Sequence, residues 1–436
     1  MSPDLVASMM TVESRTSDVP RRDPAEYRID GLTPSLALAP TSVDQVRDVL
    51  AASAEAGAAV VPWGGGTQIG FGNLPEACDL ALDLRGLNEI VEYEPDDLTI
   101  AVQSGCTLAE LNRRLGAHGE MLPVDTADPE RATIGGLVAS GFSGPRRLGY
   151  GSLRDLIIGI TVVLPDGLVA KAGGMVVKNV TGFDMMRLYH GSLGSLAVIV
   201  QVNFKVLPRP RAERTIVAHY SALEPAFDAA MTVRRSQLLP TAITLLDAGA
   251  AERTGIGGSA WTLVLRCEAP PVAVVRQAGR ISDAISAQAI ELDVLNESET
   301  ERVWARINQA LAVKPVEKEI RVRIGTAPSE IPVALDGVNA VGNENGLHVS
   351  RTVDCGSGLI YARLATEGDE VEPLRMAWST LAGLGRHATL LAAPTAVKQG
   401  TDVFGPEPAG FAVMRSLKEQ FDPNRVLNRG RFVGRL

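Results

Sequence analysis

The chain has 436 residues, of which 45% are hydrophobic and 21% charged, and its formal net charge is -9. These values are typical of a soluble globular protein that is long enough for two or three domains. The negative charge and the aromatic content of only 4% argue against a nucleic-acid partner, which needs basic patches and stacking surfaces.

The cysteines indicate no metal site in this chain. They are widely spaced and form no C-x-x-C pair, so we expect neither an iron–sulfur cluster nor zinc at Cys78, Cys106, Cys267 or Cys355. Scattered cysteines fit a reducing compartment. No apolar run reaches transmembrane length, and the start of the chain lacks the pattern of a secretion signal. We therefore expect a cytoplasmic protein without a transmembrane segment.

The first elements are predicted from capping signals. Residues 1–32 are polar around Arg21–Asp23 and are expected to be a loosely ordered extension. Ser42–Gln45 is a capping box, which predicts a helix that ends at Gly57. A strand over residues 58–61 follows, and Pro62 is expected to end it because proline has no N–H to donate.

A run of three glycines follows this strand. Glycine allows positive φ and close approach of a ligand, and successive backbone N–H groups can form an anion-binding nest. The run has neither the Lys of a P-loop nor the third glycine of a Rossmann motif. We interpret it as a cradle for a pyrophosphate, with an ordinary glycine-rich turn as the alternative. The candidate binding residues are Pro62, Trp63, Gly64, Gly65, Gly66, Thr67 and Gln68.

A second cluster of small residues covers residues 132–151. Short strands over 80–84, 89–93 and 98–102, and a helix capped by Thr107, precede it. Glycine is costly inside a helix, so we expect the cluster to be non-helical backbone against a flat or anionic ligand, or else a series of tight turns. The candidate binding residues are Thr133, Gly135, Gly136, Ser140, Gly141, Gly144, Gly149, Tyr150 and Gly151.

The next segments are predicted to be strands over 157–164 and 168–172, joined by a turn at Pro165–Gly167. Gly191–Gly194 then leads into another apolar strand that ends at Pro208. The segments after it alternate strands and helices in a βαβ-like order over 214–287. The whole pattern indicates an α+β fold, because it lacks the regular alternation of a doubly wound parallel sheet.

Five motifs in this order resemble the FAD-binding domain of the vanillyl-alcohol-oxidase/p-cresol-methylhydroxylase family. They are the glycine run, Thr133–Gly136, Val163–Gly167, Gly191–Gly194, and the closing pair Phe421–Pro423 and Leu427–Arg431. The resemblance implies an FAD-binding domain of two α+β subdomains over 33–212 and a smaller α+β cap or substrate domain over 213–380. It also implies a C-terminal segment over 381–436 that packs back on the FAD domain.

The resemblance also implies FAD contacts at Asn428 and at the backbone of Ile199, with a plain core position as the alternative for Ile199. Family members can bind the flavin covalently through a histidine in the first loop. Thr67 stands there in this chain, so we expect non-covalent FAD.

Three further stretches resemble the FAD-binding subunits of bacterial glycolate oxidases: Gly173–Asp184, Gly385–Leu390 and Val403–Pro406. Arg429 departs from the pattern, since proline is usual there, and residues 211–380 match weakly. Catalytic relatives carry a histidine set of which Gly342–His348 keeps only a faint echo. Arg386 and His387 are the candidate catalytic residues, because they precede the segment that approaches the flavin in this family.

Three functions remain open at this point. The chain is expected to be the FAD-carrying subunit of a glycolate oxidase complex acting on small 2-hydroxy acids, with a catalytic flavoprotein and an iron–sulfur subunit as partners. Any membrane association would then come through those partners. The alternative is a stand-alone FAD-dependent 2-hydroxy-acid dehydrogenase, and the third reading is a protein that binds FAD without redox work.

Overall fold

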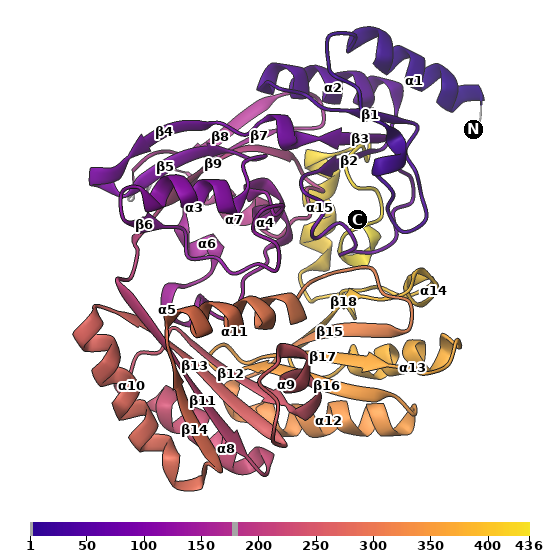
Figure 1. Ribbon diagram of the computed structural model, residues 1–436. Helices are drawn as coiled ribbons and strands as arrows, with labels where there is room; N and C mark the ends of the chain where they lie inside the picture. Colours follow the sequence, from indigo (N-terminus) through magenta and orange to yellow (C-terminus); the bar gives the residue numbers. More distant parts are fainter. Residues whose placement is uncertain (1–2, 177–181) are drawn as a thin grey trace.

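The computed structural model describes residues 3–176 and 182–436, so residues 177–181 of the stretch Gly173–Asp184 lie outside the described residues. Two bodies are visible in Figure 1. The upper one holds the N-terminal part of the chain and the last helix, and the lower one is a large sheet with helices.

The upper body begins with a small parallel sheet in the order β1-β3-β2, formed by Leu36–Leu38, Leu80–Asp83 and Val60–Trp63. The helix α2, Val43–Ala56, is capped by Ser42 and ends at Gly57 with φ +66°, as predicted. Pro62 does not end β2, which continues to Trp63. Proline is tolerated there because β2 lies at the edge of this sheet.

The N-terminal residues differ from the expectation of a loose extension. Residues Pro3–Arg15 form α1, which packs against α2 (Figure 1). Val12 is fully buried in the core that α2 shares with the first sheet, and Tyr27 and Ile29 are buried nearby. The extension is therefore ordered by apolar side chains that lie far apart in an otherwise polar segment.

A five-stranded antiparallel sheet completes the upper body, in the order β4-β5-β9-β7-β8. Its strands are Ile90–Glu94, Thr99–Gln103, Val198–Lys205, Ile157–Val163 and Val169–Gly173. The short strands β6, Glu120–Met121, and β10, Leu207–Pro208, pair beside it. The helices of this part are α3, Leu108–Gly116; α4, Ile134–Ser140; α5, Arg147–Tyr150; α6, Leu153–Leu156; and α7, Met185–Tyr189.

The second glycine cluster is wrongly predicted to be non-helical, because its residues 134–140 form α4 and its residues 147–150 form α5. Gly135 is needed inside this helix for packing. A Cβ atom there would lie 2.7 Å from the Cβ of Ser104 on the neighbouring strand end. The close approach of helix and sheet offsets the conformational cost of glycine.

The lower body is built on an eight-stranded antiparallel sheet in the order β14-β11-β13-β12-β16-β17-β15-β18. In that order the strands are Glu291–Leu295, Ala212–Tyr220, Trp261–Ala269, Ala242–Asp247, His348–Asp354, Leu359–Ala365, Glu319–Gly325 and His387–Ala392. The strand β18 pairs with β15, so this sheet includes residues from the C-terminal part of the chain.

Helices cover both faces of this sheet. One face packs against α8, Leu223–Arg235; α10, Pro271–Ile285; α12, Ile331–Glu344; and α13, Glu372–Leu381. The other face packs against α9, Ala248–Thr254, and α11, Glu297–Ala310. Figure 1 shows α11 between the sheet and the upper body, with part of the sheet beside it left uncovered by helices.

After β18 the chain returns to the upper body through α14, Thr395–Lys398, and α15, Phe411–Phe421. This return brings the C-terminal residues to the glycine loop (Figure 1). Within the described ranges, no helix has both the length and the apolar character needed to cross a bilayer.

Candidate functional site

The glycine loop after β2 packs against the segment that leads into α4. A Cβ atom at Gly64 would lie 2.2 Å from Thr133 Oγ1, and one at Gly65 would lie 1.7 Å from the carbonyl oxygen of Arg131. Arg131 also donates a hydrogen bond of 2.9 Å to the carbonyl of Gly65. Only glycine therefore fits at these two positions, and the two segments form one wall.

Three cavities meet at this wall. The first, which we call the loop cavity, brings together residues from both predicted clusters and from the C-terminus. It is lined by Pro62, Gly64, Gly65, Gly66, Thr67, Gln68, Ile69, Phe71, Thr133, Gly136, Ala139, Ser140, Leu193, Asn428 and Arg431. Most of the predicted binding residues therefore share one site, although Pro62 and Asn428 lie 366 residues apart in the chain.

The second cavity adjoins the first and shares Gly64 and Thr133 with it. It is also lined by Trp63, Gly135 and Ile199, which are three of the candidate binding residues. A third cavity of about 480 Å³ lies on the other side of Gly65 and contains the cations Arg85, Arg114 and Arg131. Thr133 lines all three cavities, and the backbone N–H groups of the glycine wall beside it suit an anionic cofactor.

Some predicted residues line none of these cavities. Gly141 ends α4 with φ +65° beside Gly191, and Gly144 packs on Asp125. Gly149 packs on Thr241 at the start of the lower sheet and donates a hydrogen bond of 3.2 Å to its carbonyl. Tyr150 and Gly151 follow directly, and burial raises the pKa of Tyr150. The contact of Gly149 with Thr241 joins the two bodies.

Arg431 is not among the residues predicted from the sequence, and the C-terminal return places it in the loop cavity. Its guanidinium donates to the carbonyls of Ile69 at 2.6 Å and Phe71 at 2.7 Å, and burial lowers its pKa to about 10. Its buried Nε has no hydrogen-bond partner among the described residues. The signal in the sequence was the place of Arg431 at the end of the closing motif.

These features fit FAD. A buried cation with an unused donor requires an anionic or polar group nearby, and the buried Oγ of Ser104, in the second cavity, is also unpartnered among the described residues. The glycine wall presents backbone to the cavity without side chains. Residues 64–68, Thr133, Asn428 and Arg431 would hold the cofactor, which supplies a two-electron acceptor when bound.

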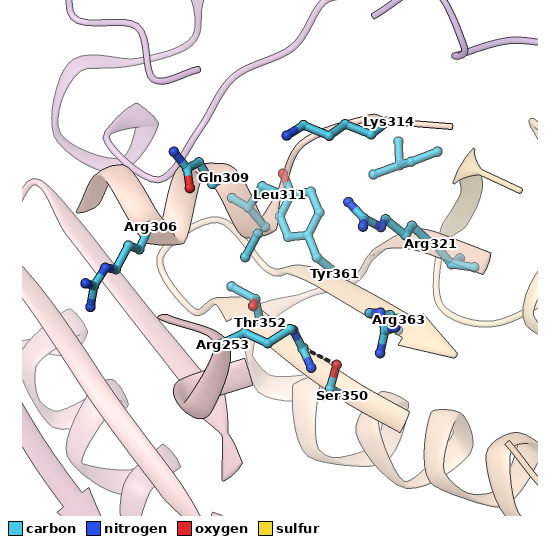
Figure 2. A pocket seen from close by; sticks show the side chains of 14 residues that line it. Arg253, Arg306, Gln309, Leu311, Lys314, Arg321, Ser350, Thr352, Tyr361 and Arg363 are labelled. Atoms are coloured by element: carbon cyan, nitrogen blue, oxygen red, sulfur yellow. Dashed lines mark hydrogen bonds between the residues drawn. The ribbon is translucent and has the colours of Figure 1, made fainter. Parts of the chain in front are cut away.

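A fourth cavity of about 340 Å³, which we call the sheet cavity, lies on the lower sheet beside α9 and α11. Figure 2 shows its side chains, which come from α9, from α11 and the segment after it, and from β15, β16, β17 and β18. Its cationic residues are Arg253, Arg306, Lys314, Arg321 and Arg363. The sheet cavity is therefore a site for anions.

One buried carboxylate forms ion pairs with two of these cations. Glu319 accepts from Arg321 at 2.8 Å and forms an ion pair with Arg363. Burial by itself would raise the pKa of Glu319, but the hydrogen bonds from Arg363 and Arg321 hold it below its usual value. Glu319 therefore stays ionised and fixes both guanidinium groups.

One apolar cluster borders both the sheet cavity and the loop cavity. Phe71 and Leu193 line the loop cavity, Leu391 and Tyr361 line the sheet cavity, and all four pack together with Val313. The sheet cavity and the loop cavity are thus neighbours that share this apolar cluster.

Arg386 and His387 are not brought to this site, so the catalytic role expected for them lacks structural support. The strand β18 runs antiparallel to β15, with His387 opposite Gly325 and Ala392 opposite Arg321. Arg321 lines the sheet cavity, so His387 lies at the far end of β18. Arg386 is exposed and lies 3.6 Å from Glu330. His348 is also exposed and contacts Glu367 at 3.0 Å.

Comparison with known proteins agrees with this geometry. Residues 34–173 match the family of the FAD binding domain, and residues 406–432 match the C-terminal domain of FAD linked oxidases. The chain is an FAD-dependent oxidoreductase. The predicted cofactor and the predicted α+β fold class are therefore confirmed.

Two curated relatives match nearly the whole chain. The glycolate oxidase subunit GlcD of Bacillus subtilis is 26% identical and covers 92% of this chain and 89% of its own length. The D-lactate dehydrogenase of Archaeoglobus fulgidus is 25% identical, with coverages of 94% and 96%. The glycolate oxidase subunit GlcE of Escherichia coli is 41% identical over a shorter match, 33% of this chain and 41% of its own length.

Solved structures show the same fold. The 4-ethylphenol oxidase of Gulosibacter chungangensis superposes with a TM-score of 0.74 at 14% identity and covers 99% of this FAD-dependent oxidoreductase and 97% of its own chain. p-Cresol methylhydroxylase gives a TM-score of 0.73 with the same coverage. Both match across the two bodies, so the bodies form one known arrangement.

We expect FAD to be held without a covalent bond in this oxidoreductase. Thr67 lines the loop cavity at the place where family members can carry a flavin-linked histidine, and a threonine hydroxyl does not form that bond. Acid precipitation of the purified protein should release all of the yellow cofactor. Flavin that stays in the washed pellet would contradict this assignment.

Proposed function

We propose that this chain oxidises small 2-hydroxy acids and that it works as the FAD-carrying subunit of a glycolate-oxidase-type complex. The observation that carries the proposal is the position of the cationic sheet cavity directly beside the glycine loop. A 2-hydroxy acid has a carboxylate, which needs cations, next to a carbon that gives up a hydride.

The arginines suit the carboxylate of such a substrate. Arg321 and Arg363 project from neighbouring strands, and Glu319 holds both in fixed orientations. A guanidinium binds a carboxylate through two parallel hydrogen bonds, so orientation as well as charge is specified. The substrate's hydroxyl-bearing carbon would then face the apolar cluster and the loop cavity.

The proton of the substrate hydroxyl also needs an acceptor. No histidine is among the residues that line the sheet cavity or the three cavities at the glycine wall. The described residues also contain no group of acidic, histidine or cysteine side chains that could hold a metal ion. This supports a role in which a partner flavoprotein carries part of the catalysis.

Electrons that leave the cofactor need a further carrier. The cysteines Cys78, Cys106, Cys267 and Cys355 are all buried and unpaired, and burial raises the pKa of each thiol. We therefore propose an iron–sulfur subunit as the second partner. We place the complex in the cytoplasm, with any membrane association supplied by its other chains.

The second candidate is a stand-alone dehydrogenase. It is favoured by the D-lactate dehydrogenase relative, which matches along the whole chain and not only in the FAD-binding part.

Dye-linked turnover of glycolate and D-lactate separates the two candidates. If the chain works as a subunit of a complex, turnover is expected only after the partner chains are co-purified with it. If the isolated chain, shown to be monomeric by light scattering, turns over either acid at about 1 s⁻¹ or faster, the complex account fails and the stand-alone dehydrogenase replaces it.

A further inference from the structure

The sheet cavity carries more positive charge than one carboxylate can neutralise. Arg253, Lys314, Arg321 and Arg363 line it, and Glu319 is the acidic group bonded to two of them. Arg253 donates instead to the neutral hydroxyl of Ser350 (Figure 2). Arg321 and Arg363 already contact Glu319, so an acid with a single charge held by Arg321 would leave Arg253 bonded to the hydroxyl of Ser350 and not to an anion.

The cations form an ordered row across the sheet. Arg321 on β15 is paired with Arg363 on β17, and Arg363 is paired with Ser350 on β16. Directly paired residues point to the same face, so the three side chains stand side by side. Arg253 of α9 donates a hydrogen bond to Ser350 and therefore lies at that end of the row. The other end, beyond Arg321, is Ala392 on β18, next to Leu391 of the apolar cluster.

The length of this row sets the distance between the anionic groups that a ligand would need. Two strand spacings separate Arg321 from Ser350, which is roughly 10 Å. A short chain with an anionic group at each end spans this distance when a hydrogen bond of about 3 Å is added at either end. The end near Arg321 lies beside the apolar cluster and the loop cavity, and the end near Arg253 lies away from them.

Repulsion between the cations of this row supports a second anion at the end near Arg253. Burial lowers the pKa of Arg253 and the charge of Arg363 lowers it further, while the charges of Asp247 and Glu319 act in the opposite direction. The positive charges of Arg253 and Arg363 repel each other, and an anion between them would relieve that repulsion.

We propose that the substrate is a 2-hydroxy acid with a second anionic group three or four atoms from the first, held between Arg253 and Arg363 while Arg321 holds the reacting carboxylate. This inference rests on the proposed function and specifies its substrate class. The second group is a carboxylate or a phosphate, since both accept paired hydrogen bonds from arginine.

Calorimetric titration of the FAD-loaded full-length chain with acids that cannot be oxidised tests this. Succinate and glutarate should bind at least about tenfold more tightly than butyrate and pentanoate, the monoacids of equal length. 2-Phosphoglycolate separates the two kinds of second group: tighter binding than glutarate assigns a phosphate, and weaker binding assigns a carboxylate. Equal affinities for diacids and monoacids would overturn the proposal.

Variants locate the second anion. Arg253→Gln should lower the ratio of diacid to monoacid affinity about tenfold, and Arg253→Lys should restore part of it. Arg276→Gln, on the exposed face of α10, is the matched control and should leave the ratio unchanged. A ratio that Arg253→Gln does not alter, in protein that keeps its thermal midpoint, would contradict the assignment.

These titrations use no redox step, so they fail or succeed independently of substrate oxidation. If hydroxy acids reduce the flavin but diacids bind no better than monoacids, the proposed function stands and the dianion inference falls.

Discussion

Gly65→Ala is expected to abolish FAD binding. The added Cβ would lie 1.7 Å from the carbonyl oxygen of Arg131, which is far inside contact distance, and the obstacle is backbone and cannot rotate away. The glycine loop and the start of α4 would have to separate, and these two segments form the wall of the loop cavity. A distortion of about 2–3 kcal/mol weakens FAD binding by roughly two orders of magnitude.

Gly70→Ala is the matched control, because it lies in the same loop and a Cβ there meets no atom within 4 Å. Flavin content per chain after gel filtration is the measurement, with far-ultraviolet circular dichroism to show that secondary structure is kept. Gly65→Ala should emerge colourless and Gly70→Ala yellow. Equal flavin content in both variants would remove the loop from the binding site. Gly135→Val would crowd Ser104 in the second cavity, so this variant should also emerge from gel filtration without flavin.

Asp422→Ala is expected to destabilise the fold by about 3–5 kcal/mol, because it leaves a buried lysine without its counter-ion. Lys418 on α15 donates to Asp422 at 2.5 Å and to the carbonyls of Ser195 and Leu427. Asp422 is fully buried and also accepts from the backbone N–H groups of Val426 and Leu427. The carboxylate thus fixes the turn that carries Asn428 into the loop cavity.

The size of this effect is measured by urea unfolding of the cofactor-free protein. Glu419→Ala, exposed on the same helix, is the control and should change the unfolding free energy by less than about 0.5 kcal/mol. Lys418→Met should cost less than Asp422→Ala, since Asp422 would keep its two backbone donors. If Lys418→Met lowers the free energy of unfolding more than Asp422→Ala does, the carboxylate of Asp422 is not the group that fixes this turn.

Local signals in the sequence predicted much of the upper body. Ser42 and Thr107 cap α2 and α3 as expected, and Gly57 ends α2. The turn at Pro165–Gly167 joins β7 and β8. Each of these features depends on residues that are neighbours in the chain, where capping and turn rules hold.

Features set by contacts between distant residues could not be predicted in the same way. The helix α1 is ordered by packing on α2, and α4 is helical despite its glycines because it lies on Ser104. The sheet cavity needs the pairing of β15, β16 and β17, which brings together cations from separate segments. His387 was a plausible candidate in sequence, but only the register of β18 shows which end of the strand it occupies.

We propose that a hydroxy acid anchored by Arg321 in the sheet cavity lies against FAD held in the loop cavity, where the bound FAD would supply the two-electron acceptor. Anaerobic mixing of the FAD-loaded protein and its partner chains with glycolate, D-lactate and a hydroxy diacid, while the flavin absorbance is followed, tests this placement directly. Bleaching of the flavin is expected, and Arg321→Gln, which removes the carboxylate anchor, should slow it at least about tenfold. An oxidised flavin that no hydroxy acid bleaches, or bleaching that Arg321→Gln leaves at its original rate, would contradict it.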